Sequence, residues 1–357
     1  MANALTNVKV TRDDSLWEAE VRAEIPAEVL EKYRGETLKE LQKTAKLDGF
    51  RPGKAPLDRI IEVYGEPSIL RHAAEHAIEH ELPELLAAEN LMIVDTPRVT
   101  TESPAAGKAL SFTARAPLAP KVDLPDYKSL AKKQPLPGTE EIEVSDKEHA
   151  EALAHLQRER ARIDKIEAGT EAQKAAEEAR GMAEGDLPAL DDAFVQTLGY
   201  ESAEKFKEVL KMNIKNEKEL KATEKRRAAI LDELVKEATI NYPAVMREYE
   251  LDDMEARMKD DLARAGTTLE AYLEQSKKTR EEIRTLWKDA ADKRAKVRLI
   301  LSEIARKEKI EPDQTQLEKE IEHAKEHYPN ADVGALRAHI AHAMRNDATL
   351  QFLEKIV

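Results

Sequence analysis

Apolar residues occupy every second position in two stretches near the N-terminus. The first stretch consists of Trp17, Ala19, Val21, Ala23 and Ile25. The second consists of Leu110, Phe112, Ala114, Ala116 and Leu118. A side-chain period of two is typical of a strand with one buried face. We therefore predict strands over residues 17–25 and 110–118.

Between these strands the apolar spacing becomes helical. Pro26 suits the first position of a helix, because its missing N–H would have no partner there. The apolar positions after it are Leu30, Tyr33, Thr37, Leu38, Leu41 and Ala45. A second helix is expected over about 66–90, with Ile69, Ala73, Ala77, Leu82, Leu85 and Leu86. Residues 1–118 are thus predicted to form a small α+β domain with an antiparallel sheet.

A stretch rich in proline follows this domain. Its breakers are Pro117, Pro120, Pro125, Pro135, Pro137 and Gly138. They are expected to interrupt any regular element as far as Thr139. Ser145 and Glu148 have the spacing of a capping box, which predicts a helix from there to about Glu167. Residues 119–186 are therefore expected to be a linker with one long helix.

After Tyr200 the chain is predicted to be almost purely helical. Its few glycines and prolines divide it into amphipathic segments over about 202–240, 243–265, 268–277, 279–309, 312–328 and 332–355. Thr267 with Glu270 and Thr279 with Glu282 have capping-box spacing at two of the starts. Residues 187–357 are therefore expected to form an extended, mostly α-helical domain.

Composition supports an extended body with a large wetted surface. Of 357 residues, 36% are charged and only 4% are aromatic. The 41% apolar content nevertheless argues against a wholly disordered chain. There is no cysteine, so disulfide and thiolate chemistry are excluded. The sequence contains no secretory signal pattern and no run long enough for a membrane span, so we expect a cytoplasmic protein without a membrane partner.

The net charge of −14 argues against a general nucleic-acid binder. Residues 41–60 reverse that sign, with five cations against two carboxylates. The cations are Lys43, Lys46, Arg51, Lys54 and Arg59, and the acids are Asp48 and Asp58. This stretch is a local basic island of net charge +3.

Two kinds of motif in the sequence resemble catalytic sites but lack residues or spacings that those sites need. Gly49, Gly53 and Lys54 invite comparison with a phosphate-binding loop, but the glycines are too close and Ala55 replaces the metal-binding hydroxyl. The zinc-peptidase pattern H-x-x-E-H occurs twice, starting at His76 and His323, without an identifiable third ligand. Solvated helix faces explain both occurrences better. We expect no catalytic residue, no metal and no cofactor.

The stretch GFRPGKAP at residues 49–56 has two interpretations. As a helix–helix connection it needs its glycines and prolines. A turn does not need an exposed Phe50 beside Arg51, however. An aromatic anchor next to a planar guanidinium is typical of an interface hot spot. The residues alone leave docking and plain turn equally supported.

With the following helix LDRIIEVYG, this stretch resembles the ribosome-docking signature G-F-R-x-G-K-x-P of bacterial trigger factor. DLPALDDAFVQTLG at 186–199 and LQFLEKIV at 350–357 resemble the same family. The resemblance implies a ribosome-docking domain at 1–118, an arm helix at 119–186 and a helical cradle with arms at 187–357. The implied docking residues are Gly49, Phe50, Arg51, Pro52, Gly53 and Lys54. Family members often have Lys at the position of Pro52. Proline carries no charge, so the third cationic contact to ribosomal RNA that the resemblance would imply is not expected from this residue.

The implied function is that of an ATP-independent chaperone beside the exit tunnel of the large ribosomal subunit. Its partners would be a tunnel-exit protein, ribosomal RNA and nascent or unfolded polypeptides, and a homodimer away from the ribosome stays open. Family members also carry an FKBP-like prolyl isomerase domain. Here the connector before residue 186 is shorter than the roughly 50 residues that a domain core needs. Isomerase activity and a helical scaffold without clients are the alternatives.

Client binding would then depend on apolar helix surface. The candidate residues are Met212, Met246, Met254, Met258, Met344 and Phe352. Methionine is adaptable and suits a surface that accepts many partners. The alternative for each residue is packing between helices.

Overall fold

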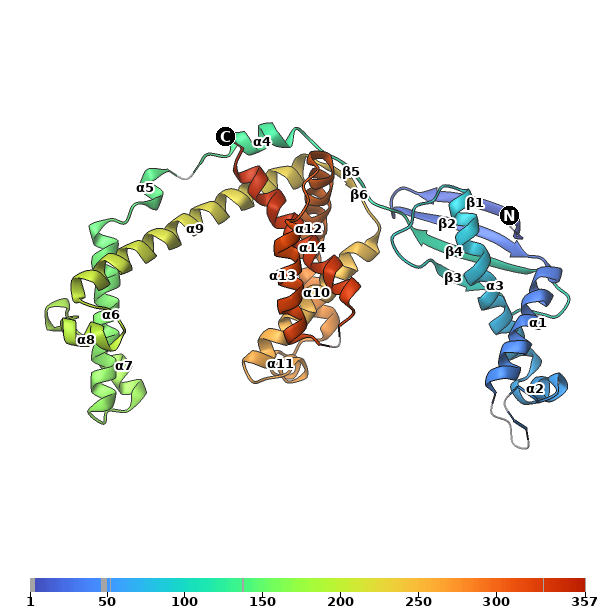
Figure 1. Cartoon of the computed structure of the whole chain (residues 1–357), viewed down its shortest axis with the longest axis horizontal. Helices are drawn as coiled ribbons and strands as arrows, with labels where there is room; N and C mark the ends of the chain where they lie inside the picture. Colours follow the sequence, from blue (N-terminus) through green and yellow to red (C-terminus); the bar gives the residue numbers. More distant parts are fainter. Residues whose placement is uncertain (1–3, 46–49, 52, 137, 330, 357) are drawn as a thin grey trace. The chain divides into compact units, whose positions relative to one another are not determined.

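The computed structural model describes residues 4–45, 50–51, 53–136, 138–329 and 331–356. These residues divide into two compact units. Their helices and strands are labelled in Figure 1. Unit 1 consists of Met1–Leu124 and Glu237–Lys309, and unit 2 of Pro125–Lys236 and Ile310–Val357. Both units are therefore built from separate stretches of the chain. The division into domains at 118 and 186 stays a prediction.

A four-stranded antiparallel sheet forms the N-terminal part of unit 1. Its strands are β1 (Thr6–Asp13), β2 (Glu18–Ile25), β3 (Arg98–Thr101) and β4 (Leu110–Pro117), in the order β1-β2-β4-β3. The two predicted strands are confirmed as the central pair. Their alternation matches the burial, because Val21 and Ala114 are fully buried while Arg22 and Arg115 are exposed. The edge strands β1 and β3 were not predicted.

Three helices complete this part of unit 1. They are α1 (Ala27–Thr44), α2 (Leu57–Tyr64) and α3 (Glu66–Ala88). The apolar stripe of α3 packs with the inner face of the sheet and with Leu30 and Tyr33 of α1 in one buried cluster. A second cluster joins the C-terminal half of α1 to α2 and the start of α3 through Leu38, Ile60 and Ile69. The predicted helices are thus confirmed, although Pro26 is the N-cap of α1 rather than its first residue.

The rest of unit 1 is a helical arm. It consists of β5 (Lys121–Asp123), β6 (Thr239–Asn241), α10 (Ala244–Arg264), α11 (Leu269–Ser276) and α12 (Arg280–Glu308). Strands β5 and β6 pair antiparallel and bring two distant stretches of chain together. Helices α10 and α12 pack against each other.

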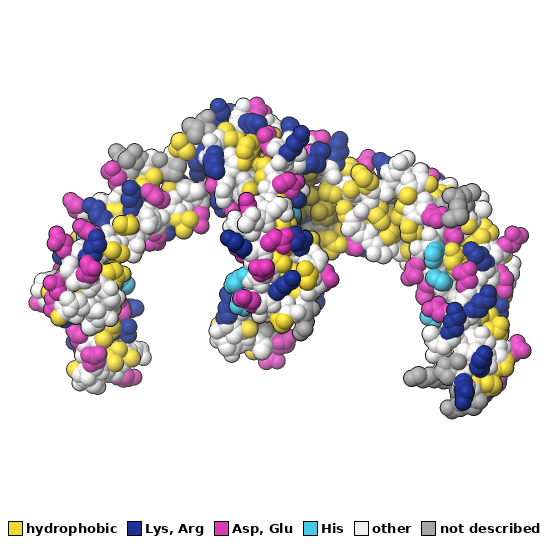
Figure 2. Space-filling view, viewed as in Figure 1, with side chains coloured by type: hydrophobic (Ala, Val, Ile, Leu, Met, Phe, Trp, Pro, Cys, Tyr) yellow, Lys and Arg dark blue, Asp and Glu magenta, His cyan; other side chains and the backbone are white. Residues whose placement is uncertain are grey.

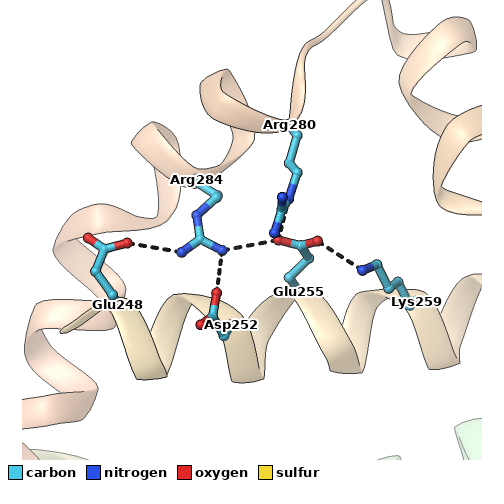
Figure 3. A network of polar contacts seen from close by, with 6 residues as sticks. All are labelled: Glu248, Asp252, Glu255, Lys259, Arg280 and Arg284. Carbon is cyan, nitrogen blue, oxygen red and sulfur yellow. Dashed lines mark hydrogen bonds and ion pairs between the residues drawn. The ribbon is translucent and has the colours of Figure 1, made fainter. Parts of the chain in front are cut away.

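Ion pairs join α10 to α12 along their length. Arg284 of α12 contacts Glu248, Asp252 and Glu255 of α10 at 3.0, 2.7 and 3.1 Å (Figure 3). The Glu255 carboxylate also accepts from Arg280 at 2.8 Å. Although burial of Glu255 opposes ionisation, its hydrogen bonds to cations lower the pKa of the carboxyl from 4.5 to about 2. Ion pairs are therefore a large part of the contact between α10 and α12.

In its described residues, unit 2 contains helices and their connections but no strand. Its helices are α4 (Tyr127–Lys133), α5 (Thr139–Ile142), α6 (Asp146–Glu167), α7 (Ala172–Arg180), the short 3₁₀ helix η1 (Glu184–Asp186), α8 (Asp192–Thr197), α9 (Ala203–Glu237), α13 (Gln314–His327) and α14 (Val333–Glu354). Helix α6 packs on α7, and α13 packs on α14. The six helical segments predicted after Tyr200 are confirmed as α9 to α14, except that the first was predicted to run to residue 240. It ends at Glu237, because Thr239 and Ile240 belong to β6 and pair with β5.

The buried Arg226 of α9 ties two helix ends together in unit 2. Its guanidinium donates to the carbonyl oxygens of Ala131 and Gln134 at the end of α4. It also donates to those of Glu354 and Ile356 at the end of α14. The carbonyl ends of helices carry partial negative charge, so a cation is favourable at this junction.

Two predictions about helix ends were wrong. The proline-rich stretch does not interrupt every element, since β5 and α4 both lie within it. Asp126 caps α4 by accepting from the Ser129 N–H, so the helix starts at Tyr127, two residues after Pro125. At α11 the N-cap is Thr268, which accepts from the Ala271 N–H, rather than Thr267. The capping boxes of α6 and α12 are confirmed.

Among the described residues, no helix is both long and apolar enough to cross a membrane.

Candidate functional site

The base of the turn after α1 is held by one residue, Gln42. Its backbone carbonyl accepts from the Gly53 N–H at 2.9 Å. Its side-chain amide donates to the Ala55 carbonyl at 2.7 Å. Ala55 is buried in the cluster that joins α1, α2 and α3. These contacts fix the returning end of the turn against the helices.

The turn presents the predicted docking side chains outward. Phe50 is 40% exposed, and Arg51 and Lys54 are also exposed. Neither cation makes a hydrogen bond or ion pair through its side chain with another residue that the structure describes. Gly53 has φ +79°, a conformation that suits glycine. Gly49 and Pro52 lie outside the described residues.

The surroundings of the turn keep the basic character that the sequence indicates. Figure 2 shows Lys and Arg side chains beside apolar ones over the α1–α2 end of unit 1. Arg59, also in the basic island, differs from Arg51 because its guanidinium lies 2.5 Å from the Glu62 carboxylate. Arg51 and Lys54 are therefore the cations on the described part of the turn that can meet a partner without losing an internal ion pair.

Two of the six predicted client residues meet in one place. Met254 and Met258 of α10 lie with Leu262 and with Trp287 of α12 around an open hollow of about 410 Å³. All four side chains are half-buried. Charged Arg257 and Asp261 complete the rim. The hollow offers adaptable apolar surface within a charged arm.

The structure does not bring the other four client candidates into this hollow. Met212 of α9 is 57% exposed and lies on a largely polar stretch of helix. Met246 of α10 and Met344 of α14 are half-buried. Phe352 of α14 is half-buried as well, with the Lys128 ammonium 5.7 Å from its ring centre. These residues stay predictions as client contacts.

No metal centre is formed by the parts of the chain that the structure describes, because no group of three or more suitable ligands comes together there. The histidines of the first H-x-x-E-H pattern take part in ring packing instead. The rings of His76 and His80 are 5.5 Å apart, and both lie near Tyr33.

Gln42 and Trp287 were missed by sequence reasoning. Gln42 is a polar residue inside an amphipathic helix and carries no pattern that indicates its two contacts. Trp287 is one of only two tryptophans and lies four residues after Ile283 on a charged helix. An aromatic residue in that setting is the one signal that could have added it to the client candidates.

Comparison with known protein families shows to which family this chain belongs. Residues 6–156 match the family model described as bacterial trigger factor protein, and residues 202–353 match the model of its C-terminus. The chain belongs to the trigger factor family. The first match includes the whole turn at 49–56, and the second includes the hollow on α10 and α12.

Relatives within the trigger factor family are distant in sequence. Trigger factor of Clostridium beijerinckii is 26% identical over 343 aligned positions, covering 76% of this chain and 79% of the relative. Trigger factor of Clostridium botulinum strain Kyoto is 26% identical, covering 95% and 94%. A solved structure titled "Promiscuous Substrate Recognition in Folding and Assembly Activities of the Trigger Factor Chaperone" has a TM-score of 0.52 at 15% identity, covering 99% of this chain and 100% of its own. This likeness confirms the fold.

The alignment with the second relative contains positions at which this chain has no residue. That alignment runs over 416 positions, whereas this chain has 357 residues, so at least 59 positions (416 minus 357) have no residue here. Residues 157–201, between the two family matches, contain only helices and turns. They are fewer than the roughly 50 residues that a domain core needs. This shortening agrees with a trigger factor that has no isomerase domain.

Proposed function

We propose that this protein is an ATP-independent cytoplasmic chaperone that docks on the ribosome beside the exit tunnel and shields nascent polypeptides. Membership of the trigger factor family supports this function. The single observation that carries it for this chain is the turn after α1. There an exposed Phe50 and two cations without a side-chain partner among the described residues stand on a base fixed by Gln42.

The docking contact follows from this geometry. The Arg51 guanidinium can form two parallel hydrogen bonds with one carboxylate or phosphate. Phe50 beside it excludes water and raises the strength of that contact. We further propose that the partner groups belong to a protein at the tunnel exit and to ribosomal RNA. Away from the ribosome, the chaperone forms a homodimer.

Co-sedimentation with bacterial ribosomes tests docking with two matched arginine variants. Arg51→Ala removes a cation that has no partner among the described residues, and should weaken binding by at least tenfold. Arg59→Ala removes a cation that already pairs with Glu62, and should change binding less than twofold. Equal losses in the two variants would mean that general charge, and not the turn, holds the ribosome. Light scattering of the free protein tests the homodimer.

Client shielding is assigned to the hollow formed by Met254, Met258, Leu262 and Trp287. Its apolar lining is open to solvent and interrupted by charge, which suits weak and sequence-tolerant contacts. Release then needs no nucleotide, because each contact is shallow and reversible.

Tryptophan fluorescence tests this assignment. In a Trp17→Phe protein, Trp287 is the only tryptophan. Its emission should shift to the blue when an unfolded client is added, because the ring loses water. Met258→Glu should abolish the shift and weaken suppression of client aggregation. Ala256→Glu, at an exposed α10 position outside the hollow, should leave both unchanged. A blue shift that survives Met258→Glu would place the clients elsewhere.

A further inference from the structure

An apolar groove separates α3 from the edge strand β3 in unit 1. It has a volume of about 400 Å³. Its main lining residues are Leu82, Leu86 and Ala87 on the α3 side, and Ile93, Pro97 and Val99 on the other. Glu79 is the one charged residue around it in the described chain. The groove belongs neither to the docking turn nor to the hollow on α10 and α12.

The strand beside the groove has a free edge. Strand β3 pairs only with β4, and all four of its residues are exposed. On its outer side, its backbone groups have no hydrogen-bond partner among the residues that the structure describes. Such a row of unpaired N–H and C=O groups can accept a further strand.

The two edges of the sheet differ in how they are protected. On β1 the register shifts between Thr6 and Lys9, and Asn7 has a positive φ of 51°. Lys9 and Arg12 add charge along that edge. An irregular and charged edge resists pairing with another chain. Strand β3 has the sequence RVTT and a regular register, and its β-branched residues favour extension.

We infer that β3 and the adjoining groove bind an extended polypeptide segment as an added strand. The segment's backbone pairs with the free edge of β3, and its alternate apolar side chains enter the groove. This mode of recognition combines main-chain hydrogen bonds with pockets for every second residue. The inference rests on the proposed chaperone function and adds a second client site to it.

Charge selects among the segments that fit. The carboxylate of Glu79 favours a segment with Lys or Arg beside its apolar residues. A second copy of this chain is a poorer occupant, because each copy has a net charge of −14 and the copies repel. The occupant is therefore a basic, extended stretch of an unfolded client.

Binding of a defined peptide to the full-length protein tests this inference. The probe is a fluorescein-labelled nonapeptide of alternating leucine and threonine with a lysine at each end. Ala87→Glu places a hydrated carboxylate where the apolar side chains of the peptide enter the groove, away from the lysines at its ends, and should weaken binding by at least tenfold. Ala88→Glu is the matched control, since Ala88 is also exposed at the end of α3 but does not line the groove. It should change the affinity less than twofold.

A second probe separates strand addition from plain apolar contact. The same peptide with an N-methylated backbone keeps its side chains but loses its N–H donors, and should bind at least tenfold more weakly. Equal binding of the two peptides, or equal effects of the two alanine variants, would overturn the inference. A change in molecular mass by light scattering with Ala87→Glu would show that a second copy occupies the edge, and would overturn it as well.

Ribosome co-sedimentation shows whether a failure concerns the strand site or the proposed chaperone function. The Ala87→Glu protein should still sediment with ribosomes, because the turn at 50–54 is unchanged. A wild-type protein that binds the peptide but neither docks nor suppresses aggregation would contradict the proposed function and leave the strand site standing.

Discussion

The docking turn and the helical arm of unit 1 use the same residue types in opposite ways. At the turn, Arg51 and Lys54 have no side-chain partner among the described residues. In the arm, Arg284 contacts three carboxylates, and Arg294 and Arg298 hold the buried Glu250 at 3.0 and 2.9 Å. A guanidinium that is already paired stabilises its own fold, whereas one that is held outward without a partner is available to another molecule.

This difference teaches that the number of cations in a segment does not reveal its role. The basic island differs from the rest of the chain because its net charge is positive. The arm has many arginines too, but its carboxylates lie one helix away and neutralise them. Only the pairing of side chains in three dimensions distinguishes the paired arginines of the arm from the cations of the turn. The single substitutions below therefore each change one residue whose contacts are known.

The largest effect is expected at Glu250, which is 2% exposed between Arg294 and Arg298. Glu250→Ala removes the carboxylate that Arg298 contacts and leaves Arg294 paired with Asp253. It should lower the free energy of unfolding by about 3 kcal/mol. Glu248→Ala is the control, because Glu248 pairs with Arg284 at the surface and should contribute less than about 1 kcal/mol. Urea denaturation followed by Trp287 fluorescence measures both. Equal losses would mean that the arm depends on total charge rather than on buried pairs.

A smaller loss of folding stability is expected when Arg226 is replaced, because its partners are carbonyl oxygens instead of carboxylates. Arg226→Met leaves the ends of α4 and α14 without their donor, and should cost about 1–3 kcal/mol. The neighbouring Arg227 pairs with the Glu354 carboxylate near the surface, so Arg227→Met should cost less than about 1 kcal/mol. Hydrogen exchange should show faster opening of α14 in the first variant only. Slow exchange in both would contradict the role given to Arg226.

Acid should weaken the arm through Glu255. The pKa of this carboxyl is lowered from 4.5 to about 2 in the folded protein, so its stabilising contribution is present above pH 4.5 and is lost as pH falls towards 2. Wild-type protein should therefore have a higher thermal midpoint than Glu255→Gln at pH 6, and the difference should vanish near pH 2. A difference that stays constant over this range would show that the charge of Glu255 contributes nothing.

The sequence predicts the parts of the fold that follow local periodicity. Val21 and Ala114 lie in strands with one buried face, and their alternation is enough to place β2 and β4. Strand β1 has no such face, since seven of its eight residues are exposed. Strands β5 and β6 pair across more than one hundred residues, and three residues each give no periodic signal. Tertiary pairing decides such elements.

The same limit applies to the candidate sites. The residues of the docking turn are contiguous, so a short motif contains them all. The hollow is made by Met254, Met258 and Trp287 from two helices, and their meeting depends on how α10 packs on α12. Sequence reasoning found the methionines by their chemistry but could not know which of the six candidates would lie together.

The smallest effect is expected from a change in backbone freedom at the turn. Gly53 has φ +79°, so Gly53→Ala should cost about 1–2 kcal/mol and weaken ribosome binding, because the base of the turn must shift. Gly35 lies inside α1 with open space where a Cβ would be. Gly35→Ala should instead stabilise the protein by about 0.5–1 kcal/mol and leave docking unchanged. Thermal unfolding and co-sedimentation measure both. A Gly53→Ala protein that docks normally would show that the turn geometry is unimportant.

The central claim is that docking and client shielding are separate functions of separate surfaces, and one variant tests it most directly. Phe50, Arg51 and Pro52 are replaced together by alanine, and the purified protein is measured for ribosome co-sedimentation and for suppression of client aggregation without ribosomes. We predict that co-sedimentation is abolished while suppression stays at the wild-type level. Wild-type ribosome binding by this variant, or loss of both activities in a correctly folded protein, would contradict the account.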